Sequence, residues 1–227
     1  MMADLPKIDG PRLEPKSGNA RQLVVFLHGY GADGNDLIEI GRAWQPWLPD
    51  AAFVSPHAPE PCAQAPVGRQ WFGLTFRDPG ERWRGVTTAG PILDRFLDDE
   101  LARRNLPGTA LALVGFSQGT MMALHIGLRR AVAPAAIVGY SGMLVLENER
   151  DAAAAAAAVR SRPPVLLIHG DRDELIPMQA MLLAAQGLAA VDVPVEWHVS
   201  TGIGHGIDEE GLRQGGEFLA RQFRARR

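Results

Sequence analysis

Residues 110–119 read ALALVGFSQG, and this stretch decides the fold. The apolar run Ala110–Val114 predicts a buried strand, and helix-forming residues follow from Gln118 onward. Between them stands Gly-Phe-Ser-Gln-Gly, with its serine at Ser117. A strand, a sharp turn with one serine and a helix make the nucleophile-elbow pattern. We therefore expect a strained backbone at Ser117, with a glycine on each side so that strand and helix approach closely.

The pentapeptide alone fits a second interpretation, in which Ser117 lies in an ordinary strand-to-helix turn and its hydroxyl caps the helix. A motif of this kind is a hypothesis until its context supports it. Other features of the sequence are needed to distinguish a capping serine from a nucleophile.

Composition limits the classes of protein to consider. A chain of 227 residues fits one α/β domain, which we place at 21–227 after an N-terminal arm or edge strands at 1–20. Its 46% hydrophobic and 22% charged residues are typical of a globular protein in water. A net charge of −3 without a basic stripe argues against nucleic acid as a partner. The lone Cys62 excludes an internal disulfide and a cysteine-rich metal site.

The N-terminal stretch is polar and lacks the apolar core of a secretory signal. No apolar run is long enough to span a bilayer. We therefore expect a cytoplasmic protein without stable membrane insertion.

Strand patterns alternate with helix patterns along the chain. Strands are expected at 22–27, 51–54, 110–114, 135–139, 164–168 and 194–199. Helices are expected at 36–44, 88–104, 118–130, 178–190 and 208–224, and the alanine run 152–158 predicts a helical connector. This rhythm predicts an α/β fold with a mostly parallel central sheet and helices on both faces.

Reactive side chains follow several of the predicted strands, at the sheet edge where ligand sites gather. They come in the order Ser117, then Asp171 and Asp173, then His205, which is the order of serine, acid and histidine in α/β-hydrolases. A serine hydroxyl needs a base, and the base needs an acid that fixes its tautomer. The chain has six histidines, but only His205 follows the last strand on a glycine-flanked loop. Position alone leaves both aspartates open.

The loop after the first predicted core strand completes such a site. An oxyanion hole needs two backbone N–H groups, which we expect from Gln118 and Tyr30. The segment Gly29–Gly34 also fits the dinucleotide fingerprint G-x-G-x-x-G. The next strand, however, runs into Ser55 where an acidic residue is required, so we expect no nucleotide cofactor. Asp33 is interpreted as a turn and helix cap rather than a calcium ligand.

Four segments together resemble a known family: FLHGYGADGNDL (26–37), GFSQG (115–119), HGDRDELIP (169–177) and GIGHGIDEEGL (202–212). They are similar to the phospholipase/carboxylesterase family of α/β-hydrolases, the acyl-protein thioesterase-like esterases of bacteria. The resemblance implies an α/β-hydrolase fold and metal-independent hydrolysis of carboxylic esters or thioesters. It also implies Ser117 as nucleophile, His205 as base, Asp173 as the triad acid and Asp171 as a turn residue. Tyr30 stands where the family often has leucine, which could alter the pocket wall.

Apolar residues near these loops are candidates for an acyl pocket. They are Trp71, Phe72, Leu74, Met143, Leu144 and Ile176. The alternative is that they are plain core. We expect Trp71 and Phe72, in a glycine-rich irregular segment, to line the site or to form an exposed patch suited to a homodimer.

The expected substrate is a small acyl ester of short to medium chain length. A thioesterase or lysophospholipase on the same triad, and a catalytically silent binding protein of the same fold, are the rival functions.

Overall fold

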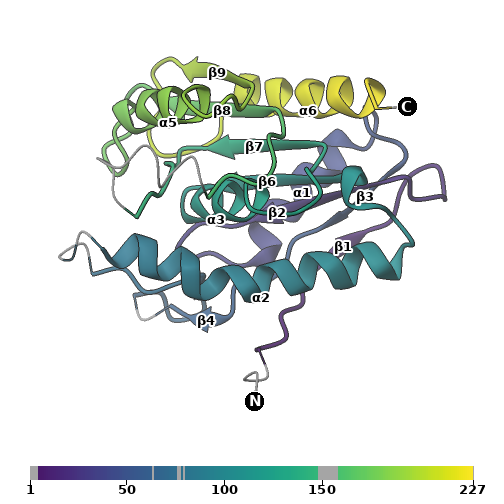
Figure 1. The fold of residues 1–227 in the computed structure, drawn as a ribbon, viewed down its shortest axis with the longest axis horizontal. Helices are drawn as coiled ribbons and strands as arrows, with labels where there is room; N and C mark the ends of the chain where they lie inside the picture. The colour runs from purple at the N-terminus through teal and green to yellow at the C-terminus, as the bar shows by residue number, and fades with distance from the viewer. Residues whose placement is uncertain (1–4, 63, 76–77, 79, 148–157, 227) are drawn as a thin grey trace.

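The computed structural model describes residues 5–62, 64–75, 78, 80–147 and 158–226. A seven-stranded sheet in the order β1-β3-β2-β6-β7-β8-β9 forms its centre (Figure 1). The strands are β1 (Arg12–Leu13), β2 (Gln22–Leu27), β3 (Ala51–Val54), β6 (Leu111–Phe116), β7 (Ala136–Tyr140), β8 (Val165–Gly170) and β9 (Val195–Ser200). All neighbours are parallel except β1 and β3, which confirms the predicted mostly parallel sheet.

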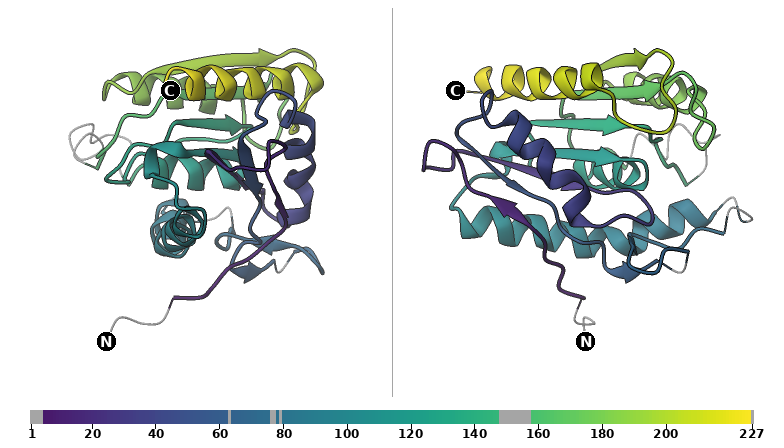
Figure 2. Two further views of the ribbon diagram at one scale, coloured as in Figure 1. Left: turned by 90° about the vertical axis from the view of Figure 1, so that its right-hand side faces the viewer. Right: turned by 180° about the vertical axis from the view of Figure 1, so that it is seen from behind.

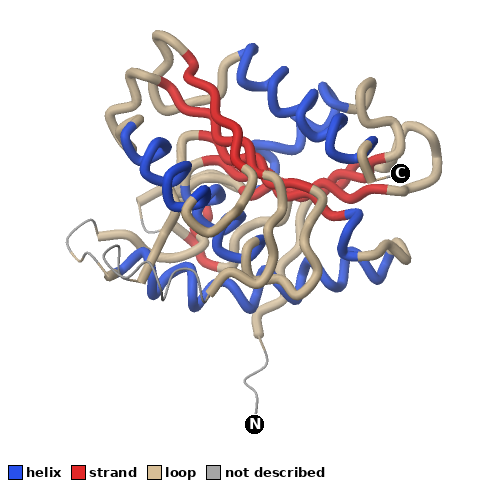
Figure 3. The backbone as a smooth tube through the Cα atoms, turned by 45° about the horizontal axis from the view of Figure 1, so that its top comes forward, coloured by secondary structure: helices blue, strands red, loops and turns tan. Residues whose placement is uncertain are grey.

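Helices cover both faces of this sheet (Figures 2 and 3). They are α1 (Gly34–Trp44), α2 (Glu81–Arg103), α3 (Gln118–Gly127), α5 (Gln179–Ala189) and α6 (Glu209–Arg224), with a 3₁₀ turn at Gly108–Ala110. One core lies between the sheet and α2, α3 and α5, and a second lies between the sheet and α1 and α6. None of the described helices is long and apolar enough to cross a lipid bilayer.

Strand β2 shows why its residues form an uninterrupted apolar run. Leu23, Val25 and Leu27 belong to the core under α2 and α3, whereas Val24 and Phe26 belong to the core under α1 and α6. Successive side chains of a strand point to opposite faces, so a strand buried on both faces must be apolar at every position. The predicted bounds of this strand are confirmed.

One predicted helix needs correction, one small sheet was not predicted, and part of another predicted helix lies outside the described residues. Helix α2 begins at Glu81 rather than at residue 88, because Gly85 lets its first turns pack on Phe72, where a Cβ would come within 2.3 Å of the ring. The two-stranded sheet of β4 (Glu60–Pro61) and β5 (Arg69–Gln70) was not predicted. Residues 152–157 of the alanine run lie outside the described residues.

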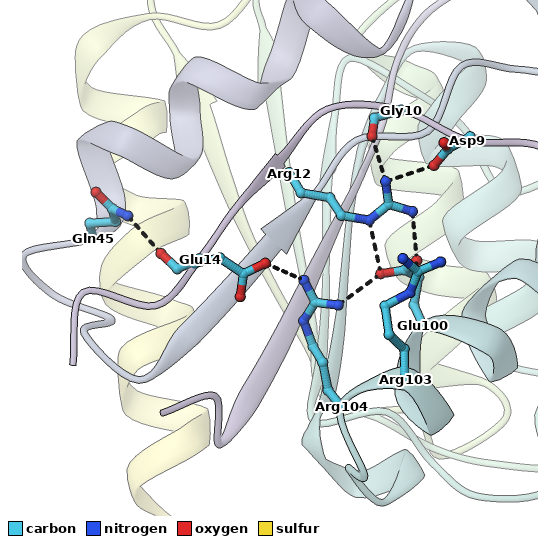
Figure 4. Close-up of polar contacts among 8 residues, drawn as sticks. All are labelled: Asp9, Gly10, Arg12, Glu14, Gln45, Glu100, Arg103 and Arg104. Carbon is cyan, nitrogen blue, oxygen red and sulfur yellow. Dashed lines mark hydrogen bonds and ion pairs between the residues drawn. The ribbon is translucent and has the colours of Figure 1, made fainter. Parts of the chain in front are cut away.

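An ion cluster fastens β1 to α2 (Figure 4). Its centre is Glu100, whose side chain is 1% exposed. The Glu100 carboxylate accepts two hydrogen bonds from the Arg12 guanidinium, at 2.7 and 3.3 Å, and one from Arg104 at 3.1 Å. Arg104 also pairs with the exposed Glu14 at 3.0 Å. The segment predicted as an arm or edge strands is thus joined to the domain at one buried charge.

We expect Glu100→Gln to lower the free energy of unfolding by about 3–5 kcal/mol, because it leaves two largely buried arginines without their shared counter-charge. The matched variant Glu14→Gln removes an exposed partner of the same Arg104 and should cost about 1 kcal/mol or less. Urea unfolding of both variants measures the difference. Equal losses for the two glutamates contradict the role given to Glu100.

Candidate active site

The turn between β6 and α3 has the strained geometry expected of a nucleophile elbow. Ser117 has φ 54° and ψ −115°, a region that non-glycine residues rarely occupy. A Cβ on Gly119 would lie 1.8 Å from the Leu27 carbonyl oxygen, and one on Gly115 would lie 2.4 Å from the Thr120 nitrogen. Only glycine fits at these two positions, so the sequence permits the sharp turn that presents the Ser117 side chain.

The Ser117 hydroxyl does not cap α3, although the residue occupies the N-cap position. Instead, Ser117 lines a pocket of about 220 Å³ whose wall also includes His205 and Gln118. The interpretation of Ser117 as a capping serine is therefore wrong. Ser117 and His205 thus line one pocket at the edge of the sheet where β6, β8 and β9 end.

The His205 imidazole is held by Asp173. Its Nδ1 lies 2.7 Å from Oδ2 of Asp173, whose side chain is 0% exposed. A carboxylate accepts, so Nδ1 carries the proton and Nε2 is left with its lone pair. The other carboxylate oxygen accepts the backbone N–H groups of Leu175 and Ile176, each at 2.9 Å.

These contacts set the charge of Asp173. Burial by itself raises the pKa of this carboxyl, but the hydrogen bonds from the Ile176 N–H and from His205 outweigh burial. The pKa of Asp173 therefore lies below its ordinary value, and the group is ionised at neutral pH. A fixed negative charge beside Nδ1 can stabilise an imidazolium on His205.

Asp171 makes a different contact. Its Oδ1 accepts the backbone N–H of Gly202 at 2.6 Å and so ties the loop that carries His205 to the end of β8. Of the two aspartates that position along the chain left open, only Asp173 is bonded to the imidazole. A second histidine, His169, lies with Nε2 3.2 Å from Oδ2 of Asp173 and donates to the Ile176 carbonyl at 2.7 Å.

Two residues of this pocket have a backbone N–H without a hydrogen-bond partner among the described residues. The N–H groups of Tyr30 and Gln118 donate to no other residue that the structure describes, and both residues line the pocket with Ser117. The N–H of Gln118 lies at the N-terminus of α3, where the helix leaves donors free. Both N–H groups are therefore free to donate to a bound ligand.

The buried His28 orients one of these donors. Its Nε2 accepts the Ala58 N–H at 3.0 Å, so Nδ1 carries the proton and donates to the Gly29 carbonyl at 2.8 Å. This carbonyl also receives the Ala32 N–H at 3.3 Å. In a trans peptide the C=O and N–H point in opposite directions, so a bonded Gly29 carbonyl turns the Tyr30 N–H away from His28.

The protonation state of His28 is consistent with the hydrogen bond from its Nδ1 to the Gly29 carbonyl. Desolvation lowers its pKa to about 4, which keeps the ring neutral with one donor and one acceptor nitrogen. The Trp71 indole N–H donates to the His28 carbonyl at 3.0 Å, and the two rings lie 5.8 Å apart. The Gln118 side chain in turn accepts the Trp71 N–H at 2.9 Å and donates to the Phe72 carbonyl at 2.8 Å. These hydrogen bonds connect the loop that carries Tyr30 to the turn that carries Gln118.

The residues expected to form an acyl pocket separate into groups. Leu74 and Ile176 line the pocket beside Ser117. Phe72 lines an adjoining groove of about 770 Å³, while Met143 and Leu144 pack against the core. Trp71 and Phe72 are 1% and 4% exposed, so of the two alternatives given for them the exposed patch is wrong. Gly85 of α2 lies against the Phe72 ring, whereas the Trp71 indole lies beside His28 and donates to its carbonyl.

Several pocket residues were not predicted. The described lining includes Arg82 from α2, Phe116 from the end of β6, Met121 from α3 and Leu175. Of these, Phe116 and Leu175 directly adjoin motif residues in the sequence, which is a signal that could have identified them. Among the described residues, no group of three or more His, Cys, Asp or Glu side chains is placed to hold a metal ion.

Comparisons with known proteins agree on one family. A family model described as Phospholipase/Carboxylesterase matches residues 8–222. Acyl-protein thioesterase 1 of Gibberella zeae is 25% identical over 225 residues, which cover 94% of this chain and 95% of that protein. Esterase YpfH of Escherichia coli is 27% identical over 194 residues, covering 86% and 80%.

A solved structure agrees with these relatives. The crystal structure of esterase PE8 matches with a TM-score of 0.90 and 42% identity, and the match covers 95% of this chain and 99% of that one. The predicted α/β-hydrolase fold is confirmed. This chain belongs to the phospholipase/carboxylesterase family of α/β-hydrolases and is a hydrolase that acts on esters.

Proposed function

We propose that Ser117, His205 and Asp173 form the catalytic triad of a carboxylesterase that works through an acyl-enzyme. One observation carries the proposal: an imidazole held at 2.7 Å by a buried carboxylate shares a small pocket with a strained serine that caps nothing. Nucleophile, base and orienting acid are the groups that acyl transfer requires.

In the proposed reaction, Nε2 of His205 takes the hydroxyl proton of Ser117 as the oxygen attacks the acyl carbon. The oxyanion accepts hydrogen bonds from the N–H groups of Tyr30 and Gln118, and each donor is worth about 3–4 kcal/mol in the transition state. His205 then protonates the leaving alcohol, and the acyl group stays on Ser117. Water, activated by His205, attacks the acyl-enzyme and releases the carboxylic acid.

The size of the pocket favours short acyl groups. Its volume of about 220 Å³ lies below the roughly 300–1,000 Å³ of pockets that hold drug-sized ligands. Leu74, Met121 and Ile176 supply apolar wall for a few methylene groups. A long acyl chain would have to leave this pocket along the adjoining groove lined by Phe72.

A panel of p-nitrophenyl esters of increasing chain length tests the proposal, with acyl-CoA and a lysophospholipid as further substrates. We expect the highest kcat/KM for short acyl esters and no turnover above background in Ser117→Ala. A preference for acyl-CoA or for the lysophospholipid would assign one of the rival activities on the same triad. Turnover that persists in Ser117→Ala contradicts the proposal.

A further inference from the structure

Arg82 brings a positive charge to the pocket that holds Ser117. It lies in the first turn of α2 and lines the same pocket as Ser117 and His205. The Arg82 Nε–H is shielded from solvent and has no acceptor. No ion pair or hydrogen bond joins its guanidinium to another residue in the described part of the chain. The buried Nε–H therefore lacks the acceptor that a buried donor normally has, and no carboxylate pairs with the guanidinium in the described part of the chain.

Two other described arginines have a similarly shielded Nε, but both are paired with carboxylates. Arg104 and Arg130 also have a shielded Nε without an acceptor. The terminal nitrogens of Arg104, however, pair with two glutamates, and those of Arg130 pair with two aspartates. Arg82 therefore differs from Arg104 and Arg130 because no described carboxylate pairs with its guanidinium. It also lies at the wall of the pocket that holds Ser117.

No carboxylate among the described lining residues of the pocket neutralises this charge. Its described lining has no aspartate or glutamate. The nearby carboxylate of Asp173 is occupied by His205 and two backbone N–H groups. The adjoining groove does carry three acids. Glu60 is bonded to Gln70, Asp78 is paired with Arg84, and Glu81 accepts hydrogen bonds from the backbone N–H and the hydroxyl of Thr75.

From this we infer that Arg82 binds an anionic group of the substrate. The inference rests on the proposed ester hydrolysis and names its substrate class: esters that carry a second, ionised carboxylate, such as monoesters of short dicarboxylic acids. A guanidinium is more weakly hydrated than an ammonium and can bind a carboxylate through two parallel hydrogen bonds. The carboxylate belongs to the acyl part or to the alcohol part of the ester, and the experiment distinguishes the two sources.

The test compares charged esters with neutral ones of the same chain length. Monoethyl glutarate against ethyl pentanoate places the carboxylate on the acyl part. The butyrate ester of glycolic acid against ethyl butyrate places it on the alcohol part. The measured quantity is the ratio of kcat/KM for the charged ester to kcat/KM for its neutral match. We expect one of the two ratios to exceed unity in the native protein and to fall about 10- to 100-fold in Arg82→Gln.

Two further variants sharpen the test. Arg82→Lys keeps the charge but loses the planar pair of donors, so its ratio should lie between those of the native protein and Arg82→Gln. Arg84→Gln is the matched control: it removes an arginine two positions away that pairs with Asp78 in the groove, and it should leave both ratios at their native values. Thermal unfolding of each variant checks that it is folded.

The outcomes separate this inference from the proposed function. If neutral esters are hydrolysed through Ser117 but neither ratio exceeds unity, or Arg82→Gln leaves both ratios unchanged, the assignment of Arg82 is wrong and the esterase proposal stands. If neither charged nor neutral esters are hydrolysed by the native protein, the esterase proposal itself fails.

Discussion

Replacing Asp173 by asparagine is expected to lower kcat by about 10⁴-fold with little change in KM. The Asp173 carboxylate accepts the Nδ1 proton of His205 at 2.7 Å, which leaves Nε2 free as the base. An amide can present its NH₂ group to the ring instead, which favours the tautomer with the proton on Nε2, and it carries no charge to stabilise the imidazolium. Steady-state kinetics with a short p-nitrophenyl ester measures the loss.

Asp171→Asn is the matched control for this prediction. It makes the same chemical change two positions away, at a carboxylate that accepts the Gly202 N–H instead of contacting the imidazole. An asparagine oxygen can still accept that bond, so kcat should fall by no more than about tenfold. Equal losses in the two variants, or a larger loss in Asp171→Asn, would remove Asp173 from its proposed role.

The second large effect is expected at His28, a residue that does not line the pocket. His28→Gln should lower kcat by about 10²- to 10³-fold, the effect of losing one oxyanion-hole donor, because it gives up the Nδ1 donor that holds the Gly29 carbonyl. His28→Asn places an amide NH₂ where Nδ1 stands and should lose less than about tenfold, although it no longer accepts the Ala58 N–H. Kinetics and thermal unfolding of both variants are the measurements.

Two tryptophans provide a control for stability. Trp71→Phe removes the indole bond to the His28 carbonyl. Trp44→Phe removes an indole bond, also at 3.0 Å, from a similarly buried tryptophan in the other core to the Leu212 carbonyl. Both should lower the melting temperature similarly, but only Trp71→Phe should lower kcat. If His28→Gln and His28→Asn are equally slow, or both tryptophan variants keep full kcat, the network does not orient the Tyr30 N–H.

Much of the fold could be predicted because it depends on short-range patterns. Strands β2 and β3 have the predicted bounds, since strands buried on both faces are apolar at every position. Asp33 caps α1 as expected, with its carboxylate accepting the Asn35 N–H at 2.7 Å. The early start of α2 could not be read from the sequence, because it depends on Gly85 packing against Phe72 across the chain. The hairpin of β4 and β5 likewise lacks a local pattern of its own.

The candidate site, like the fold, has a part that could be predicted from the sequence and a part that could not. The positions of Ser117 and His205 relative to the strands could be predicted from spacing, because parallel strands end at one edge of the sheet. The residues of the pocket wall could not be predicted in this way, because they come from α2, α3 and several loops. Trp71 illustrates the difficulty: its glycine-rich neighbourhood suggested that it lines the site or forms an exposed patch, whereas it is buried and its indole donates to the His28 carbonyl. Arg82 was not singled out because charged residues near a helix start are common.

Labelling with a fluorophosphonate tests the central claim most directly, because the reagent phosphonylates only a serine that an adjacent base has activated. The native protein should take up one label per chain, mapped by mass spectrometry to the peptide that contains Ser117, and Ser117→Ala should take up none. An unlabelled native protein, or a label on any other residue, would show that Ser117 and His205 do not work together as nucleophile and base.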